Sequence, residues 1–171
     1  MEYLQKLLLP RRKEDLEKLL SVWNSSVRST HGFLREEDIA MLIPFVRQGL
    51  REIPVLYALQ DTQGIKLGFM GTDADKLEML FLHPDARGKG YGRRMLEFAV
   101  RELGIRRLDV NEQNPAALAF YQHMGFIVTE RSQLDDMGNP WPLLRMRLND
   151  SQGDVSERGW TSKTLQPKCD V

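Results

Sequence analysis

Six residues, Arg-Gly-Lys-Gly-Tyr-Gly at positions 87–92, combine backbone freedom with positive charge. They follow an apolar run at 77–82 and precede an amphipathic stretch at 93–103, so they connect an expected strand to an expected helix. In such a connection the free N–H groups and the helix dipole favour an anion, and glycines let a phosphate approach the backbone. The segment predicts a phosphate site, although a flexible surface turn explains the glycines alone equally well.

Two common phosphate-binding motifs do not fit this segment. A P-loop requires Ser or Thr directly after its lysine, but Gly90 follows Lys89. A dinucleotide fingerprint requires a glycine where this chain has Arg93. A third pattern, Arg/Gln-x-x-Gly-x-Gly/Ala, does fit, with Arg87, Gly90 and Gly92 at its fixed positions.

On this third pattern the chain resembles the GNAT acetyltransferase superfamily. The resemblance continues at 110–126, which looks like the family's next strand and helix. The specific segments cover residues 76–128, and the order of elements fits from residue 3 to about 148. Two shorter segments, 29–34 and 131–144, also resemble small bacterial members.

Hydrophobic periodicity predicts the elements that must position the glycine turn. Strands are expected at 2–9, 54–60, 65–72, 77–84, 106–111, 127–132 and 143–148, and helices at 13–27, 35–50, 93–103 and 115–124. Pro44 is expected to kink or split the second helix. This order predicts an α/β fold (an α+β mixed sheet) with helices on both faces. The resemblance implies a GNAT-like fold, with a mostly antiparallel sheet that splays between the strands at 77–82 and 106–111.

Composition limits the class of protein. The chain has 171 residues, with Lys+Arg and Asp+Glu equal at 24 each, which argues against a general nucleic-acid binder. One cysteine, Cys169, excludes a disulfide within the chain, and no apolar run is long enough for a membrane helix. We expect a cytoplasmic monomer or homodimer with one domain at 1–148 and a polar tail at 149–171.

The resemblance implies acetyl-CoA as co-substrate, with its pyrophosphate on the amides of 88–93 and its pantetheine arm paired with the strand at 77–82. It assigns cofactor binding to Leu80, Leu82, Arg87, Gly88, Lys89, Gly90, Tyr91, Gly92, Arg93 and Asn114. From the residues alone, Asn114 is equally well explained as a helix N-cap.

The implied chemistry is direct attack of an amine on the thioester. The resemblance assigns Tyr121 as the acid that protonates the departing thiolate, and the alternative is an aromatic residue of the core. It assigns Glu78 as the base or as the holder of a water molecule, and the alternative is an ordinary exposed strand position.

Acceptor-site candidates are His31, after the first helix, and Asp135, in the last long loop. A loop histidine is more often structural, and a loop carboxylate is usually just solvated. No histidine–cysteine cluster suggests a metal site. We favour a small-molecule amine as acceptor. A protein N-terminus or lysine is one alternative. A non-catalytic acyl-CoA-binding sensor domain is another, although Tyr121 argues against it because a binding domain has no need of an acid near the sulfur.

Overall fold

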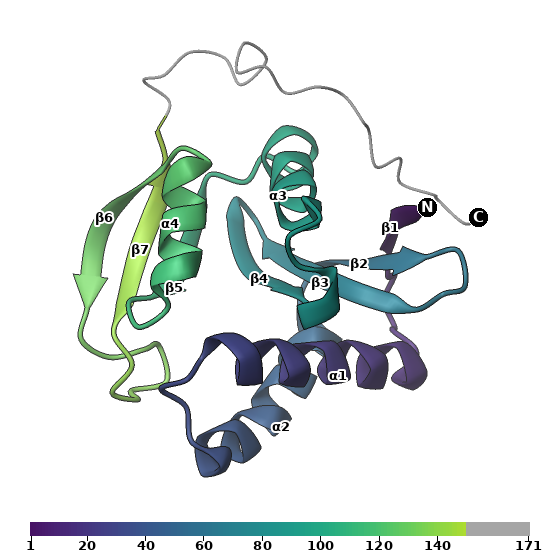
Figure 1. Ribbon diagram of the computed structural model, residues 1–171, viewed down its shortest axis with the longest axis horizontal. Helices are drawn as coiled ribbons and strands as arrows, with labels where there is room; N and C mark the ends of the chain where they lie inside the picture. The colour runs from purple at the N-terminus through teal and green to yellow at the C-terminus, as the bar shows by residue number, and fades with distance from the viewer. Residues whose placement is uncertain (150–171) are drawn as a thin grey trace. The chain divides into compact units, whose positions relative to one another are not determined.

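The computed structural model describes residues 1–149, which form two compact units, Met1–Ile105 and residues 106–149 (Figure 1). The order of helices and strands agrees with the sequence prediction, as does the α/β class. The expected tail lies, apart from Asn149, outside the described residues. The elements are β1 (Glu2–Lys6), α1 (Lys13–Thr30), α2 (Glu36–Glu52), β2 (Val55–Asp61), β3 (Lys66–Asp73), β4 (Lys76–Leu82), a 3₁₀ turn (Pro84–Ala86), α3 (Tyr91–Glu102), β5 (Arg107–Asn111), α4 (Pro115–His123), β6 (Phe126–Ser132) and β7 (Leu143–Leu148).

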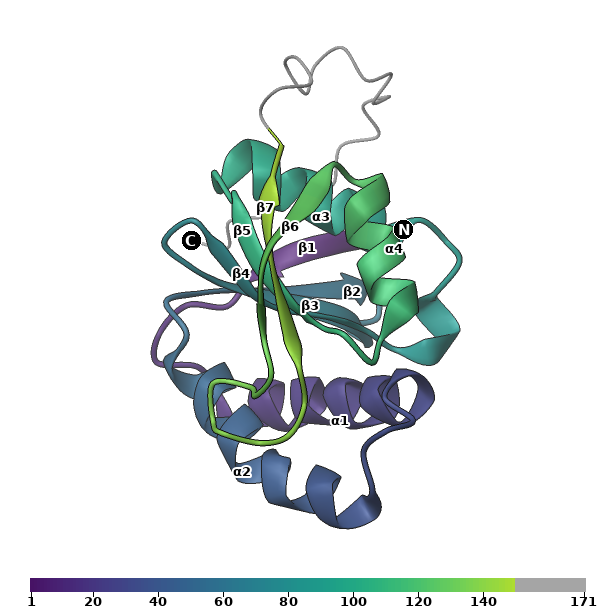
Figure 2. The same cartoon turned by 90° about the vertical axis from the view of Figure 1, so that its left-hand side faces the viewer.

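The first unit is an antiparallel sheet with helices on both faces. Strands β1 to β4 pair in chain order, α1 and α2 cover one face, and α3 covers the other (Figures 1 and 2). Because side chains alternate along a strand, Leu56 and Ala58 of β2 join the core beneath α1 and α2. Tyr57, between them, faces α3 and meets Phe98 edge-on, with ring centroids 5.1 Å apart. The predicted helices on both faces are confirmed for this unit.

The apolar stripe predicted on the first helix is its buried face. Leu16, Leu19, Leu20, Trp23 and Val27 are all buried in the core of the first unit. Burying each such side chain contributes about 1.5–3 kcal/mol. This face therefore fixes α1 on the sheet, which matters because α1 also contacts the glycine turn.

Two features of the first unit differ from the sequence prediction. Helix α2 is not split at Pro44 but continues from Glu36 to Glu52, and both Pro44 and Ala40, whose carbonyl group loses its helical partner, are exposed. Strand β1 ends at Lys6 instead of Leu9, because its pairing with β2 stops there and the chain turns towards α1.

The second unit is a three-stranded antiparallel sheet in the order β5–β7–β6, with α4 in contact with β5 and β6. An ion pair of 2.8 Å between Arg145 and Asp109 links β7 to β5. No helix within residues 1–149 is long and apolar enough to span a membrane.

Candidate active site

The glycine turn leads into an uncapped helix. Gly88 and Gly90 have φ of +71° and +79°, a region that side-chain-bearing residues rarely adopt. Gly90 is the N-cap of α3, where no side chain caps the helix and the first turn has no acidic residue. The first N–H groups of α3 and the positive end of its dipole therefore face outward without a carboxylate to neutralise them.

The space around the β-carbon positions of Gly88 and Gly90 is open. A β-carbon built on Gly88 or on Gly90 would meet no described atom within 4 Å. Protein packing therefore does not explain the glycines, whereas positive φ and the close approach of a ligand to the backbone both do. Lys89, at the tip of the turn, is exposed and makes no hydrogen bond or ion pair within residues 1–149.

The other polar side chains of the turn and of the start of α3 differ in their protein partners. Arg93 binds Glu97, with 2.7 Å between Nε and Oε1. Burial, reinforced by the nearby carboxylate of Glu2, raises the pKa of Tyr91. The buried Nε of Arg94 has no hydrogen-bond partner within residues 1–149. If Tyr91 contributes to a phosphate site, its backbone N–H is the group in position to do so.

Arg87 ties the turn to α1. Its guanidinium donates to the hydroxyl groups of Ser29 at 2.6 Å and Ser26 at 2.9 Å, and to the Ser26 carbonyl oxygen at 3.1 Å. A longer bond of 3.4 Å reaches the carbonyl oxygen of Leu82. Burial lowers the pKa of Arg87. The arginine of the motif thus holds β4, α1 and the turn together. No sequence pattern marked the two serines as its partners.

His31 lies beside this tie, at the end of α1. Burial, reinforced by the positive charge of Arg87, lowers the pKa of His31 to about 4. Its Nδ1 lies 2.7 Å from the Thr30 hydroxyl, and its ring lies 5.4 Å from that of Phe33. The imidazole is therefore neutral at neutral pH.

Strand β4 carries a β-bulge at Glu78. Gly71 of β3 pairs with Met79 and Thr72 pairs with Leu77, so Glu78 is the additional residue. Its exposed carboxylate lies 3.1 Å from the ammonium group of Lys76. Strict alternation with the positions of Leu80 and Leu82, which the sequence suggested, thus ends at the bulge. Such irregularities redirect a side chain and are frequent beside active sites.

Beyond the bulge, alternation along β4 is regular. Met79 and Phe81 pack against the core under α1 and α2, so Leu80 and Leu82 point to the opposite face of the strand. Both leucines are half-buried. The two predicted cofactor positions on β4 therefore share one face.

In the second unit, α4 holds both predicted polar residues. The Asn114 side chain accepts a hydrogen bond from the Ala117 N–H at 3.2 Å and caps the helix. Tyr121 contacts the rings of Phe120 and Phe126, with centroids 5.2 and 6.3 Å away. Burial raises the pKa of Tyr121, and no hydrogen bond to its hydroxyl group occurs within the described residues.

Asp135 organises its own loop. Its carboxylate accepts hydrogen bonds from the N–H groups of Met137 at 2.9 Å and Asn139 at 2.7 Å, and from the Asn139 amide at 2.8 Å. The turn at 135–139 depends on these bonds. A role of Asp135 in acceptor binding stays a prediction.

Comparison with known proteins bears on these observations. A family model for the acetyltransferase (GNAT) domain matches residues 53–128. The peptidyl-lysine N-acetyltransferase YjaB of Salmonella typhimurium (strain LT2) is 42% identical over 135 residues, which are 79% of this chain and 92% of that protein. The solution structure of apo-form YjaB from Escherichia coli has a TM-score of 0.76 at 37% identity, covering 86% of this chain and 97% of that one.

A more distant structure agrees in fold. The crystal structure of the PaiA N-acetyltransferase from Thermoplasma acidophilum, in complex with coenzyme A, has a TM-score of 0.61 at 24% identity and covers 86% of this chain and 99% of that one. One family is indicated by the glycine motif, by the order of helices and strands, and by the similar proteins. The chain belongs to the GNAT acetyltransferase family and is an acyl-CoA-dependent acetyltransferase.

Proposed function

We propose that this chain transfers the acetyl group of acetyl-CoA to the side-chain amine of a lysine in a peptide or protein. The main observation in favour of acetyl-CoA as the donor is the uncapped start of α3, which follows two glycines with positive φ. Relatives that are 42% and 40% identical are named peptidyl-lysine N-acetyltransferases, and these names support a lysine side chain as the acceptor. Sequence reasoning favoured a small-molecule amine, and a lysine was its alternative.

The first unit offers groups for the donor. The amides of 88–93 and the charge of Lys89 suit a pyrophosphate, and backbone groups at Leu80 and Leu82 suit an extended amide chain. Arg87 contributes to this site by holding the glycine turn in place, because its N–H groups donate hydrogen bonds to Ser26, Ser29 and Leu82. Acetyl-CoA, when bound, supplies the thioester that the amine attacks.

A lysine acceptor must first lose a proton. With a pKa of about 10.4, about one lysine in 2,500 is neutral at pH 7, so a base has a large effect. We assign this role to Glu78, whose exposed carboxylate at the bulge accepts the proton directly or through a water molecule. The neutral imidazole of His31 places no positive charge against a lysine ammonium group.

Tyr121 is our proposed acid. The ammonium group first loses one proton through Glu78 to solvent. The new C–N bond then forms as the C–S bond breaks, the second amine proton passes to Glu78, and Tyr121 protonates the sulfur and regains a proton from solvent. Burial raises the pKa of Tyr121 and keeps its hydroxyl protonated, and the absence of a described acceptor leaves the hydroxyl group available to donate. The same shift makes full proton transfer to a thiolate less favourable than the reference pKa values of about 10 and about 8.5 suggest.

Three peptides that differ only in their amines test the acceptor. The first has a blocked N-terminus and one lysine, the second replaces the lysine by arginine, and the third has a free N-terminus and no lysine. We expect thiol release from acetyl-CoA, with acetylation of the lysine seen by mass spectrometry, only for the first. Turnover of the third peptide alone would assign the N-terminus, and turnover of free amines alone would restore the small-molecule acceptor. CoA binding without any turnover would support the sensor alternative.

A further inference from the structure

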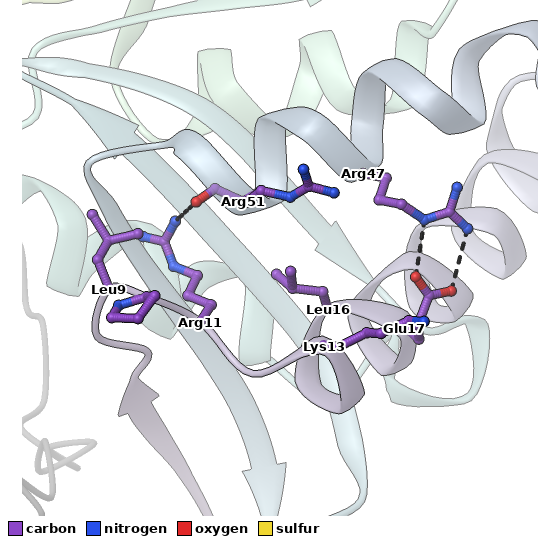
Figure 3. A pocket seen from close by; sticks show the side chains of 8 residues that line it. Leu9, Arg11, Lys13, Leu16, Glu17, Arg47 and Arg51 are labelled. Atoms are coloured by element: carbon purple, nitrogen blue, oxygen red, sulfur yellow. Dashed lines mark hydrogen bonds and ion pairs between the residues drawn. The ribbon is translucent and has the colours of Figure 1, made fainter.

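A pocket in the first unit lies at the start of α1, away from the glycine turn. It is formed by the β1–α1 connection, the first turns of α1 and the last turns of α2 (Figure 3). Its volume of about 800 Å³ falls within the range of about 300–1,000 Å³ that is typical of small-molecule sites. His31, at the other end of α1, is separated from it by the length of an 18-residue helix, about 27 Å.

The lining of the pocket is strongly cationic. Arg11, Lys13, Arg47 and Arg51 contribute four positive charges and Glu17 one negative charge, a net charge of +3 in a chain whose formal net charge is +0. The remaining lining residues are apolar. Leu9 is among them and is 57% exposed. An exposed apolar wall beside concentrated positive charge favours an anionic ligand with an apolar body.

Two of the four cations have protein partners. Arg47 holds Glu17 in a two-pronged ion pair, with N–O distances of 2.9 and 3.3 Å (Figure 3). Arg11 donates to backbone carbonyl groups at the end of α2, those of Leu50 and Arg51 at 3.0 Å and Ile53 at 2.6 Å. These contacts fix the walls of the pocket, and they leave the charge of Arg11 without a carboxylate.

The other two cations have no such partner. Neither Lys13 nor the Arg51 side chain makes a hydrogen bond or an ion pair within residues 1–149, although the charge of Lys13 helps to lower the pKa of Glu17. Both residues are exposed at the pocket. Figure 3 shows the Arg51 side chain extending along the pocket in the direction of Arg47. An arginine fork and a lysine in the lining of one pocket suit the oxygens of a phosphate or a carboxylate.

We propose that this pocket binds a small organic anion, with its phosphate or carboxylate group between Lys13 and Arg51 and its apolar body against Leu9. The site is separate from the groups that we assign to acetyl-CoA, so the anion binds together with CoA. The proposal goes beyond the proposed function and does not depend on which amine is acetylated.

Nuclear magnetic resonance titrations test the proposal. The full chain is isotope-labelled and saturated with CoA, and each probe is added while the backbone amide chemical shifts are recorded. The probes are phenyl phosphate, benzoate and the neutral benzyl alcohol. We expect one or both anions to shift the amides of Lys13 and Arg51, and benzyl alcohol to leave them unchanged. The two anions distinguish a phosphate ligand from a carboxylate ligand. No shift with either anion at its solubility limit, or equal binding of benzyl alcohol, would overturn the proposal.

A charge-matched pair of double variants completes the test. Lys13→Gln with Arg51→Gln removes both unpaired cations, and the bond from Arg11 to the Arg51 carbonyl group survives because it uses the backbone. We expect anion affinity to fall at least about tenfold, since each lost charge-assisted bond exceeds the free energy of that factor. Lys6→Gln with Arg101→Gln removes two exposed cations elsewhere in the unit and should keep full affinity. An equal loss of anion affinity in both double variants would mean that overall charge, and not this pocket, attracts the anion. Unchanged CoA binding shows that each variant is folded.

Discussion

The Tyr121 hydroxyl group distinguishes an enzyme from a binding domain. Tyr121→Phe deletes this hydroxyl and keeps the ring, whose neighbours Phe120 and Phe126 are apolar, so packing should change little. We expect kcat to fall by about 10²–10⁴, the range for a positioned general acid, while affinity for acetyl-CoA stays within a few-fold. Steady-state kinetics and direct CoA binding measure the two effects separately.

A second tyrosine provides the control for this change. Tyr3→Phe also deletes a hydroxyl group, in this case one that accepts a hydrogen bond from Gln60, and should leave kcat unchanged. Wild-type turnover in Tyr121→Phe would remove this residue from the mechanism. A fall in affinity equal to the fall in rate would mean that the hydroxyl group binds the thioester in the ground state.

His31 gives a prediction about stability and pH. Its pKa is about 4 in the folded chain, against about 6.5 when unfolded, so below pH 6.5 the unfolded chain binds a proton that the folded chain does not. Stability from the neutral imidazole is complete above pH 6.5 and is lost as pH falls towards 4. Between pH 7.5 and 5 the loss should be about 2 kcal/mol. Urea denaturation at each pH measures the free energy of unfolding. Between pH 7.5 and 5 this free energy should fall less in His31→Gln than in the wild type. An equal fall in the two proteins would contradict His31 as the cause.

At the scale of elements, the glycine turn allows a matched comparison. Gly90 in the turn and Gly64 in the β2–β3 hairpin have φ of +79° and +81°, and a β-carbon at either would meet no atom of residues 1–149 within 4 Å. Valine should therefore impose similar backbone strain at both, of order 1–3 kcal/mol. If a phosphate lies against the turn, Gly90→Val loses CoA binding and Gly64→Val keeps it, as calorimetric titration would show. If both variants keep CoA binding, the glycines serve only to form the turn.

Most elements were predictable because their signals are local. The stripe from Leu16 to Val27 has helical spacing, and the alternating segments that became β2 and β3 have the period of a strand. The continuity of α2 through Pro44 was not predictable, because the effect of a proline depends on its exposure, and exposure depends on which face of α2 packs on the core. The glycine turn was recognised by its motif, and its geometry agrees with the proposed role.

Side-chain partners far apart in the sequence were not predictable. The bond between Arg87 and Ser29 joins residues 58 positions apart, and nothing near Ser29 marks it as a partner. The bulge at Glu78 depends on the register between β3 and β4, which a periodic pattern cannot specify to one residue. The pocket at Lys13 and Arg51 exists only because α1 and α2 pack together. Sequence reasoning therefore identified candidate residues more readily than their partners.

For the whole molecule, charge balance conceals local concentration. The chain has equal numbers of acidic and basic residues, yet Lys89 at the start of α3, and Lys13 and Arg51 in the pocket between α1 and α2, make no hydrogen bond or ion pair with a carboxylate within residues 1–149. Balanced net charge disfavours general attraction to polyanions, so each cluster requires its own geometry to bind an anion. The two clusters should consequently discriminate between ligands: CoA at α3 and small organic anions at α1.

Ligand binding should be visible in the stability of the full chain. A ligand that binds only the folded state adds about 2.7 kcal/mol at a hundredfold excess over its Kd. For a chain of this size, that free energy corresponds to a rise in Tm of about 5–11 °C. We expect CoA to produce such a rise in a thermal melt, and adenosine, which lacks the phosphates and the pantetheine arm, to produce almost none. An unchanged Tm in millimolar CoA, with the protein folded at the start, would contradict CoA binding at the uncapped end of α3, and an equal rise with adenosine would place the affinity in the base instead of the phosphates.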